Sequence, residues 1–128
     1  MKTLLAIVEQ GGQPDFTSLY ESLGYKVITA ASMRKALNLI KQHKPDVITA
    51  EFIYSPMYGT RISNLESLFA VIQSRLLDTR LIVFIDRENL HHLDSLEMQH
   101  LISQQLTYPI DVKKLVSCLK PLNTMARI

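Results

Sequence analysis

The chain has 128 residues, of which 47% are hydrophobic and 20% are charged, so it can bury a core and lacks the composition of a disordered protein. Its net charge of +2 is too small to indicate nucleic-acid binding, and its single cysteine, Cys118, cannot form an internal disulfide. Its apolar runs are far shorter than the roughly 20 residues that cross a bilayer, and the first residues lack the layout of a signal peptide. We expect one soluble, cytoplasmic domain spanning residues 1–128.

The chain opens with a predicted strand and a predicted helix. Residues Thr3–Val8 form a continuous apolar run of strand length, as expected for a strand that is covered on both faces. Asp15 is placed to cap the helix that follows, and Gly24 is placed to end it. Apolar residues at helical spacing define the inner face of this helix: Phe16, Leu19, Tyr20 and Leu23.

Two further strands are predicted at Lys26–Ala30 and Asp46–Phe52. Between them Ser32 can cap a second helix, and the Lys44-Pro45 pair closes it. The predicted inner face of this helix consists of Met33, Ala36, Leu37 and Ile40.

Residues 53–62 contain Pro56 and Gly59 and are predicted to form a loop. Three large side chains in it, which form either a partner patch or a cover on the domain itself, are Tyr54, Met57 and Tyr58. The sequence Ser63-Asn64-Leu65-Glu66 has the spacing of a capping box. The amphipathic stripe of the helix behind it consists of Leu65, Leu68, Phe69, Ile72 and Leu76.

The last third of the chain contains two more predicted strands. Arg80–Ile85 is the fourth, and Leu101–Thr107, a weaker pattern, is the fifth. Residues 90–100 between them have a poorer helical pattern. Asp111 is placed to cap a final helix, and Pro121 is expected to end it. The residues predicted to face inward on this helix are Val112, Leu115, Val116 and Leu119.

Strand and helix thus alternate five times, and helical crossovers make consecutive strands parallel. The predicted fold class is α/β, a doubly wound five-stranded parallel sheet flanked by helices. Ligands of such sheets bind at the carboxyl ends of the strands. Residues just after the predicted strands are therefore the candidates for function, namely Glu9, Gln10, Glu51, Asp86, Tyr108 and Pro109.

The strand ends resemble those of the receiver domains of two-component response regulators, which are CheY-like proteins. Residues 44–51 are similar to the run that leads to the phospho-accepting aspartate of the family, which places Glu51 at the acceptor position. Residues 106–111 are similar to the lysine–proline turn, with Tyr108 in place of the lysine and Pro109 at a proline that is commonly cis. The resemblance covers nearly the whole chain and implies a flavodoxin-like topology with strand order 2-1-3-4-5.

The residues at these positions depart from the chemistry of the family. Glu9 and Gln10 stand where receivers place the acidic pair that binds magnesium. Asp86 stands where they carry a Ser or Thr, and Gln105 replaces the switch aromatic. The resemblance therefore implies a degenerate receiver, or pseudo-receiver, in which phosphotransfer chemistry is replaced.

Phosphorylation of Glu51 would be impeded for two physical reasons. Its carboxylate lies about 1.5 Å further out than that of an aspartate, and a misplacement of about 1 Å can cost on the order of 100-fold in rate. An incoming phosphoryl group, with about −1.5 to −2 charge, would also face Asp86 and find no lysine. We favour a fixed conformation, in which Tyr108 donates a hydrogen bond to Glu51 or Glu9. Constitutive mimicry of the phosphorylated state is the alternative.

A cation site is a weaker hypothesis for the same edge. Glu9, Glu51 and Asp86 would form a carboxylate cluster, and weak Mg²⁺ binding through Glu9 and Glu51 is one interpretation, since hard divalent ions take oxygen ligands. The other is that these are partly solvated acids, balanced by Arg61 or Arg87. The histidines near residue 91 lack the spacing of a helical zinc site.

The function that we predict is that of a phosphorylation-independent, non-enzymatic receiver-like module in phosphorelay signalling, with no cofactor. Its partner would be a signalling protein, an effector or a second copy, without nucleic-acid or membrane contact, and any output domain would lie outside this sequence. By resemblance, the partner surface would include Gln105, Lys113, Lys114 and Lys120. One alternative is a weakly competent receiver that uses Glu51 with magnesium. Another is a flavodoxin-like domain that binds a small ligand in the same crevice.

Overall fold

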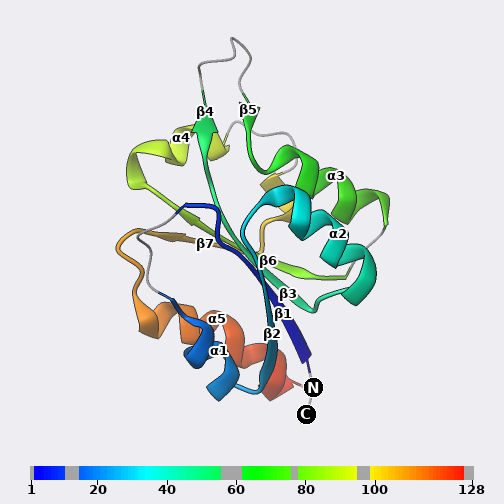
Figure 1. The fold of residues 1–128 in the computed structure, drawn as a ribbon. Coiled ribbons are helices and arrows are strands. Elements are labelled where there is room, and N and C mark those ends of the chain that lie inside the picture. Colours follow the sequence, from blue (N-terminus) through cyan, green and yellow to red (C-terminus); the bar gives the residue numbers. More distant parts are fainter. Residues whose placement is uncertain (1, 11–14, 56–61, 76–77, 95–98, 126–128) are drawn as a thin grey trace.

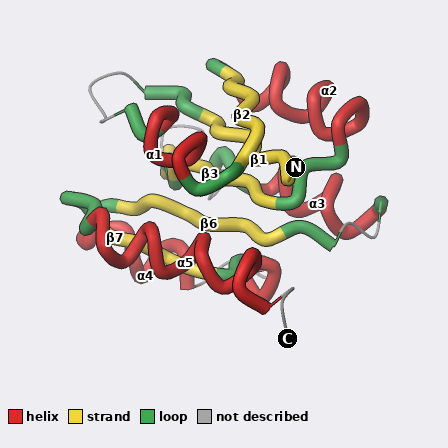
Figure 2. The backbone as a smooth tube through the Cα atoms, turned by 90° about the horizontal axis from the view of Figure 1, so that it is seen from below, coloured by secondary structure: helices red, strands yellow, loops and turns green. Residues whose placement is uncertain are grey.

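A single five-stranded parallel sheet forms the centre of the molecule (Figure 1). The computed structural model describes residues 2–10, 15–55, 62–75, 78–94 and 99–125. The strands of the sheet are β1 (Lys2–Ile7), β2 (Tyr25–Ala30), β3 (Val47–Glu51), β6 (Arg80–Ile85) and β7 (Gln104–Thr107). Their spatial order is β2-β1-β3-β6-β7, which is the predicted order 2-1-3-4-5. Figure 2 shows them side by side in that order.

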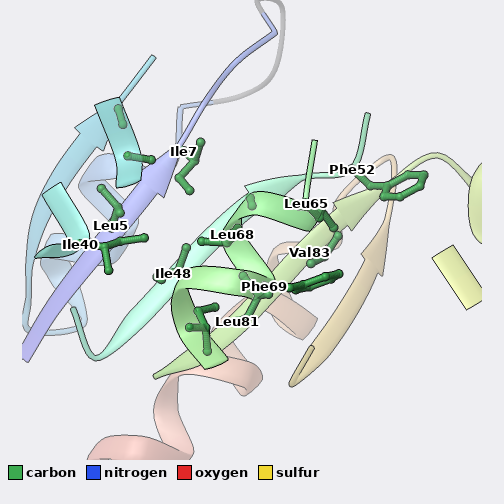
Figure 3. Close-up of a cluster of buried hydrophobic side chains, with 14 of the residues drawn as sticks. Leu5, Ile7, Ile40, Ile48, Phe52, Leu65, Leu68, Phe69, Leu81 and Val83 are labelled. Carbon is green, nitrogen blue, oxygen red and sulfur yellow. The ribbon is translucent and has the colours of Figure 1, made fainter. Parts of the chain in front are cut away.

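Helices cover both faces of the sheet, which explains why the strands are apolar on both sides. They are α1 (Thr17–Ser22), α2 (Met33–His43), α3 (Glu66–Ser74), α4 (Leu90–Asp94) and α5 (Val112–Met125). Leu5 and Ile48 belong to a core cluster with α2, α3 and α4, while the alternate residues Leu4 and Val47 pack with α1 and α5. Figure 3 shows the first cluster, in which Leu68 and Phe69 of α3 lie over Ile48 and Leu81.

The predicted end of α1 and the predicted cap of α2 are confirmed, whereas the prediction that Asp15 caps α1 is wrong, because the N-cap residue is Phe16 and it makes no side-chain cap hydrogen bond. The Asp15 carboxylate accepts a hydrogen bond from the backbone N–H of Thr17 at 2.9 Å. Gly24 follows α1 with a φ of 95°, a left-handed conformation that glycine adopts without strain. The hydroxyl of Ser32 accepts from the N–H of Lys35 at 3.2 Å and caps α2.

The segment between β3 and α3 differs from the prediction. The expected loop contains a small antiparallel pair, β4 (Tyr54–Ser55) and β5 (Ile62–Ser63). The predicted capping box is wrong, because Ser63 belongs to β5 and α3 begins only at Glu66, after an N-cap residue, Leu65, that makes no side-chain cap hydrogen bond. Met57, Tyr58 and Leu76 lie outside the described residues, as does the Tyr54 side chain.

The elements around residues 87–104 are shorter than predicted. A 3₁₀ turn (Arg87–Asn89) leads into α4, and a second 3₁₀ turn (Gln99–Leu101) precedes β7. Strand pairing begins where the backbone N–H of Ser103 donates to the carbonyl of Leu81, so β7 starts after the apolar pair at 101–102 rather than with it. The cis Tyr108–Pro109 bond follows β7, as the resemblance implied.

The final helix corrects two predictions. Val112 is 48% exposed, and among the α5 side chains that the structure describes, those up to residue 119, the buried ones are Leu115, Cys118 and Leu119, because packing on the sheet begins one turn into the helix. Pro121 does not end α5, which continues to Met125. A proline inside a helix costs about 3 kcal/mol, because it removes its own N–H donor and its ring clashes with the carbonyl four residues earlier, and α5 tolerates this cost. Within the described ranges no helix is both long and apolar enough to cross a bilayer.

Candidate functional site

The carboxyl ends of the strands bring the predicted residues to one edge of the sheet. Glu51 is the last residue of β3, in register with Phe84 of β6. Glu9 and Gln10 follow β1, and Asp86 follows β6. The backbone N–H of Tyr108 donates to the carbonyl of Ile85, which fixes the end of β7 beside the end of β6.

Glu51 is buried, with 3% of its surface exposed. Its Oε1 accepts hydrogen bonds from the backbone N–H groups of Glu9 at 3.0 Å and Gln10 at 2.9 Å. These donors come from the segment after β1, so the side chain links the ends of two neighbouring strands. The expectation that Glu51 is held in place is therefore met, through backbone donors.

The carboxylate of Glu9 is held by two other donors. Its Oε1 accepts from the side-chain amide of Asn64 at 2.8 Å, and its Oε2 accepts from the backbone N–H of Met33 at 3.3 Å. Because Met33 is the first residue of α2, Glu9 connects the end of β1 to the start of that helix.

Asn64, a residue that the sequence analysis assigned to a helix cap, joins this network from the segment after β5. Besides binding Glu9, its Nδ2 donates to the backbone carbonyl of Glu51, and its Oδ1 accepts from the N–H of Ile53 at 2.7 Å. The same residue pairs with Ile53 through its own backbone N–H. One amide therefore satisfies groups on both sides of the small hairpin. Nothing in the local pattern indicated this role.

Tyr108 does not make the hydrogen bond that we predicted. Its hydroxyl oxygen is buried and has no hydrogen-bond partner in the described part of the chain. Glu51 and Glu9 are held instead by backbone N–H groups and by the Asn64 amide. Burial raises the pKa of Tyr108 well above its usual value, and the charges of Glu51 and Asp86 raise it further. The tyrosine therefore stays neutral in a region of negative potential.

Asp86 and Gln105 make no hydrogen bond to Glu9, Glu51 or Asn64. Both side chains are exposed, and Gln105 pairs with Val83 on the edge strand β7. The predicted cluster of three carboxylates is therefore wrong, and the described residues contain no group of three acidic, histidine or cysteine side chains that could hold a metal ion. Of the two cations proposed to balance these acids, Arg87 is exposed, and Arg61 lies outside the described residues.

A cavity of about 290 Å³ opens beside Glu51 on the α1 side of the sheet. Phe16, Phe84 and Tyr108 contribute aromatic walls, and the ring of Phe84 meets each of the other two edge-on. Tyr20 also lines it, and burial raises the pKa of that tyrosine to about 12 despite a hydrogen bond with Thr49.

A second cavity, of about 520 Å³, lies between β7 and α5. Among the residues that the structure describes, its charged lining residues are basic, namely Arg80, Lys113 and Lys114, and Gln104 and Gln105 form its polar wall. Cys118 lines its base, and burial raises the pKa of that thiol. Lys113, Lys114 and Gln105, three of the four residues predicted for a partner surface, thus share one hollow; the Lys120 side chain lies outside the described residues.

No protein-family model matches the chain, and no curated protein matches its sequence. Solved structures match over almost its full length. A response regulator receiver domain protein from Clostridium thermocellum has 17% identity and a TM-score of 0.73, with 98% of this chain and 99% of that chain covered. A response regulator protein from Burkholderia multivorans has 22% identity and a TM-score of 0.70, with 95% and 94% covered.

A third similar structure is a response regulator receiver modulated diguanylate cyclase from Pelobacter carbinolicus, with 21% identity, a TM-score of 0.66 and complete coverage of both chains. Identities of this size establish a shared fold. The chain therefore has the fold of response regulator receiver domains, as its strand-end residues implied.

Proposed function

We propose that this receiver fold is a non-enzymatic signalling module of a two-component system that recognises a protein partner without being phosphorylated. The observation that carries the proposal is the closure of the strand-end site by its own groups. Oε1 of Glu51 and both oxygens of Glu9 accept protein N–H donors. The single cysteine, which suits a reducing compartment, supports a cytoplasmic location.

Phosphorylation would have to break this closure. To present Oε1 to a phosphodonor, Glu51 would leave the part-buried N–H groups of Glu9 and Gln10 without this acceptor, and a donor left unsatisfied when buried costs about 1–3 kcal/mol. A magnesium ion would compete with the Asn64 amide and the Met33 N–H for Glu9. Phosphoryl transfer also needs placed positive charge, and the lysine position holds a neutral tyrosine.

Intact-mass spectrometry after incubation with acetyl phosphate and Mg²⁺ tests this proposal. We expect no phosphoryl adduct on the native chain, while a receiver domain with the usual aspartate and lysine, treated alongside, acquires one. Addition of beryllofluoride with Mg²⁺ should leave the amide spectrum unchanged. A stable adduct on Glu51 together with a changed spectrum would instead establish the weakly competent receiver.

The basic hollow between β7 and α5 is the partner surface that we propose. Lys113 and Lys114 are exposed at the start of α5, and Arg80, the first residue of β6, contributes a third positive charge. Clustered positive charge favours an acidic partner segment and raises its association rate. The same surface could hold a second copy of the chain only if that copy presents acidic residues.

Affinity capture with a matched pair of variants tests this surface. A Lys113→Glu, Lys114→Glu double variant should lose the partner that the native chain captures from its own organism. An Arg34→Glu, Lys35→Glu variant makes the same charge change at exposed positions of α2 and should still capture the partner. Equal capture by both variants would place the interface elsewhere. Sedimentation of the native chain reports self-association.

A further inference from the structure

We propose that the cavity beside Glu51 binds a small organic cation, a protonated amine on a compact aromatic or apolar body. This inference concerns a ligand site rather than the partner surface, so it goes beyond the function proposed above. It rests on the size of the cavity, the kinds of side chain that line it, and a buried hydroxyl, that of Tyr108, which has no hydrogen-bond partner among the described residues.

The size and walls of the cavity suit a single ring with a short side chain. Its volume of about 290 Å³ is roughly twice that of an engineered cavity that holds benzene. Phe16 and Phe84 lie with ring centroids 6.2 Å apart, and Phe84 and Tyr108 with centroids 6.4 Å apart. These rings, with aliphatic atoms of Ala6 and Ile7, make most of the lining apolar.

The charges on the described lining of the cavity are of one sign. Among described residues, the lining includes the carboxylates of Glu51 and Asp15 and no Lys, Arg or His. Asp15 is exposed at the outside, whereas Glu51 is 3% exposed. A phosphate or carboxylate ligand would be repelled here, while a cation would be attracted, and burial strengthens both effects.

A carboxylate and a hydroxyl on the cavity wall are available to the ligand. Oε1 of Glu51 accepts two backbone N–H groups, and a carboxylate has about four acceptor positions on its two oxygens, so it can also accept from a ligand. The hydroxyl of Tyr108 is buried and, among described residues, unpartnered. An unsatisfied buried polar group costs about 1–3 kcal/mol. An ammonium has three donors, so one group can bind the carboxylate and the hydroxyl oxygen, and aromatic faces stabilise its charge.

Three ligands that share one body and differ in charge test the proposal: phenethylamine, phenethyl alcohol and hydrocinnamate. Each is titrated into the isotope-labelled native chain, and amide shifts are followed by NMR. We expect the amine to bind at least about 10-fold more tightly than the alcohol, equivalent to about 1.4 kcal/mol, and hydrocinnamate not to bind. The shifted amides should be those of Glu9, Gln10, Phe84 and Tyr108.

Two variants identify the groups that bind the amine. Glu51→Gln keeps an oxygen for the N–H groups of Glu9 and Gln10 but removes the charge, so amine affinity should fall about 10-fold while the alcohol is unaffected. Tyr108→Phe should weaken the amine several-fold. Gln105→Ala, in the other cavity, is the control and should change neither affinity. If Glu51→Gln does not fold, titration of the three ligands into the native chain and into Tyr108→Phe still tests whether charge and the hydroxyl determine binding.

Several outcomes would overturn this proposal. Binding of hydrocinnamate as tight as that of the amine would remove the role of charge, and shifts confined to Lys113 and Lys114 would place the ligand in the other cavity. Absence of any shift with the amine at low-millimolar concentration would remove the site. None of these results bears on phosphorylation or partner capture, so the proposed function stands or falls separately.

Discussion

The longer side chain of Glu51, which at first counts against phosphotransfer, is what lets its carboxylate reach the segment after β1. Its Oε1 lies 3.0 Å from the N–H of Glu9 and 2.9 Å from that of Gln10. An aspartate would end one carbon–carbon bond, about 1.5 Å, earlier. The residue therefore acts as a structural anchor between the ends of β1 and β3.

Substitutions at Glu51 should distinguish the effect of its side-chain length on stability from the effect of its charge. We expect Glu51→Ala and Glu51→Asp each to lower the free energy of unfolding by about 2 kcal/mol, since both leave two part-buried N–H donors without their acceptor. Glu51→Gln should lose less because its carbonyl oxygen can still accept. Urea unfolding measures all three, with Glu21→Gln on the exposed face of α1 as the neutral control. An aspartate variant as stable as the native chain would contradict the anchor role.

Asn64 offers a second test at the residue scale, because its amide donates to Glu9 and accepts from Ile53. Asn64→Ala should cost about 2 kcal/mol of unfolding free energy. Asn64→Asp keeps the acceptor but sets two carboxylates against each other, which raises the pKa of the pair in the folded state.

The aspartate variant should accordingly lose more stability at neutral pH and recover part of it as the pH falls and the pair takes up a proton. Urea unfolding at several pH values measures this recovery. Asn38→Asp on the exposed face of α2 should show no such pH dependence. A loss of stability in Asn64→Asp that does not change with pH would contradict direct contact with Glu9.

At the scale of elements, the sequence predicts best where burial repeats regularly along the chain. β6 has the predicted bounds, because a continuous apolar run is what a strand covered on both faces requires. The two-residue strands β4 and β5 were missed because they are too short to carry a periodic pattern. The site shows the same limit: strand ends located Glu51 and Glu9, but their partners are backbone N–H groups and the distant Asn64, which no local pattern reveals.

The cap of α2 gives a prediction for an element. Ser32→Ala removes the acceptor for the N–H of Lys35 and should lower the free energy of unfolding by about 1 kcal/mol. Ser32→Asp should restore most of it, since aspartate is an equally good N-cap. Thermal or urea unfolding of the pair measures the effect, and equal stability of all three chains would mean that the cap contributes nothing.

At the scale of the whole molecule, the two helical layers bury tyrosines that titrate far from their usual range. Burial raises the pKa of Tyr20 to about 12 from 10.0. An unfolded chain releases this proton near pH 10, so the stability that the neutral tyrosine contributes is complete below pH 10 and is lost as the pH rises through 12. A pKa difference of about two units corresponds to a loss of at most about 3 kcal/mol in the free energy of unfolding.

Urea unfolding at a series of alkaline pH values should therefore show a falling free energy above pH 10. Tyr20→Phe should flatten this dependence, although Tyr25 and Tyr108, whose pKa values are also raised, keep part of it. A native chain whose stability is constant between pH 10 and 12 would contradict the burial of these hydroxyls.

The two backbone N–H groups that Glu51 binds lie 42 and 41 positions away from it in the sequence. Consequently the amide protons of Glu9 and Gln10 report on the assembled core. Each exchanges with deuterium only when its hydrogen bond to the buried carboxylate, 42 or 41 positions away, breaks. The exchange rates of these two amides thus measure how often the carboxyl ends of β1 and β3 separate by local unfolding.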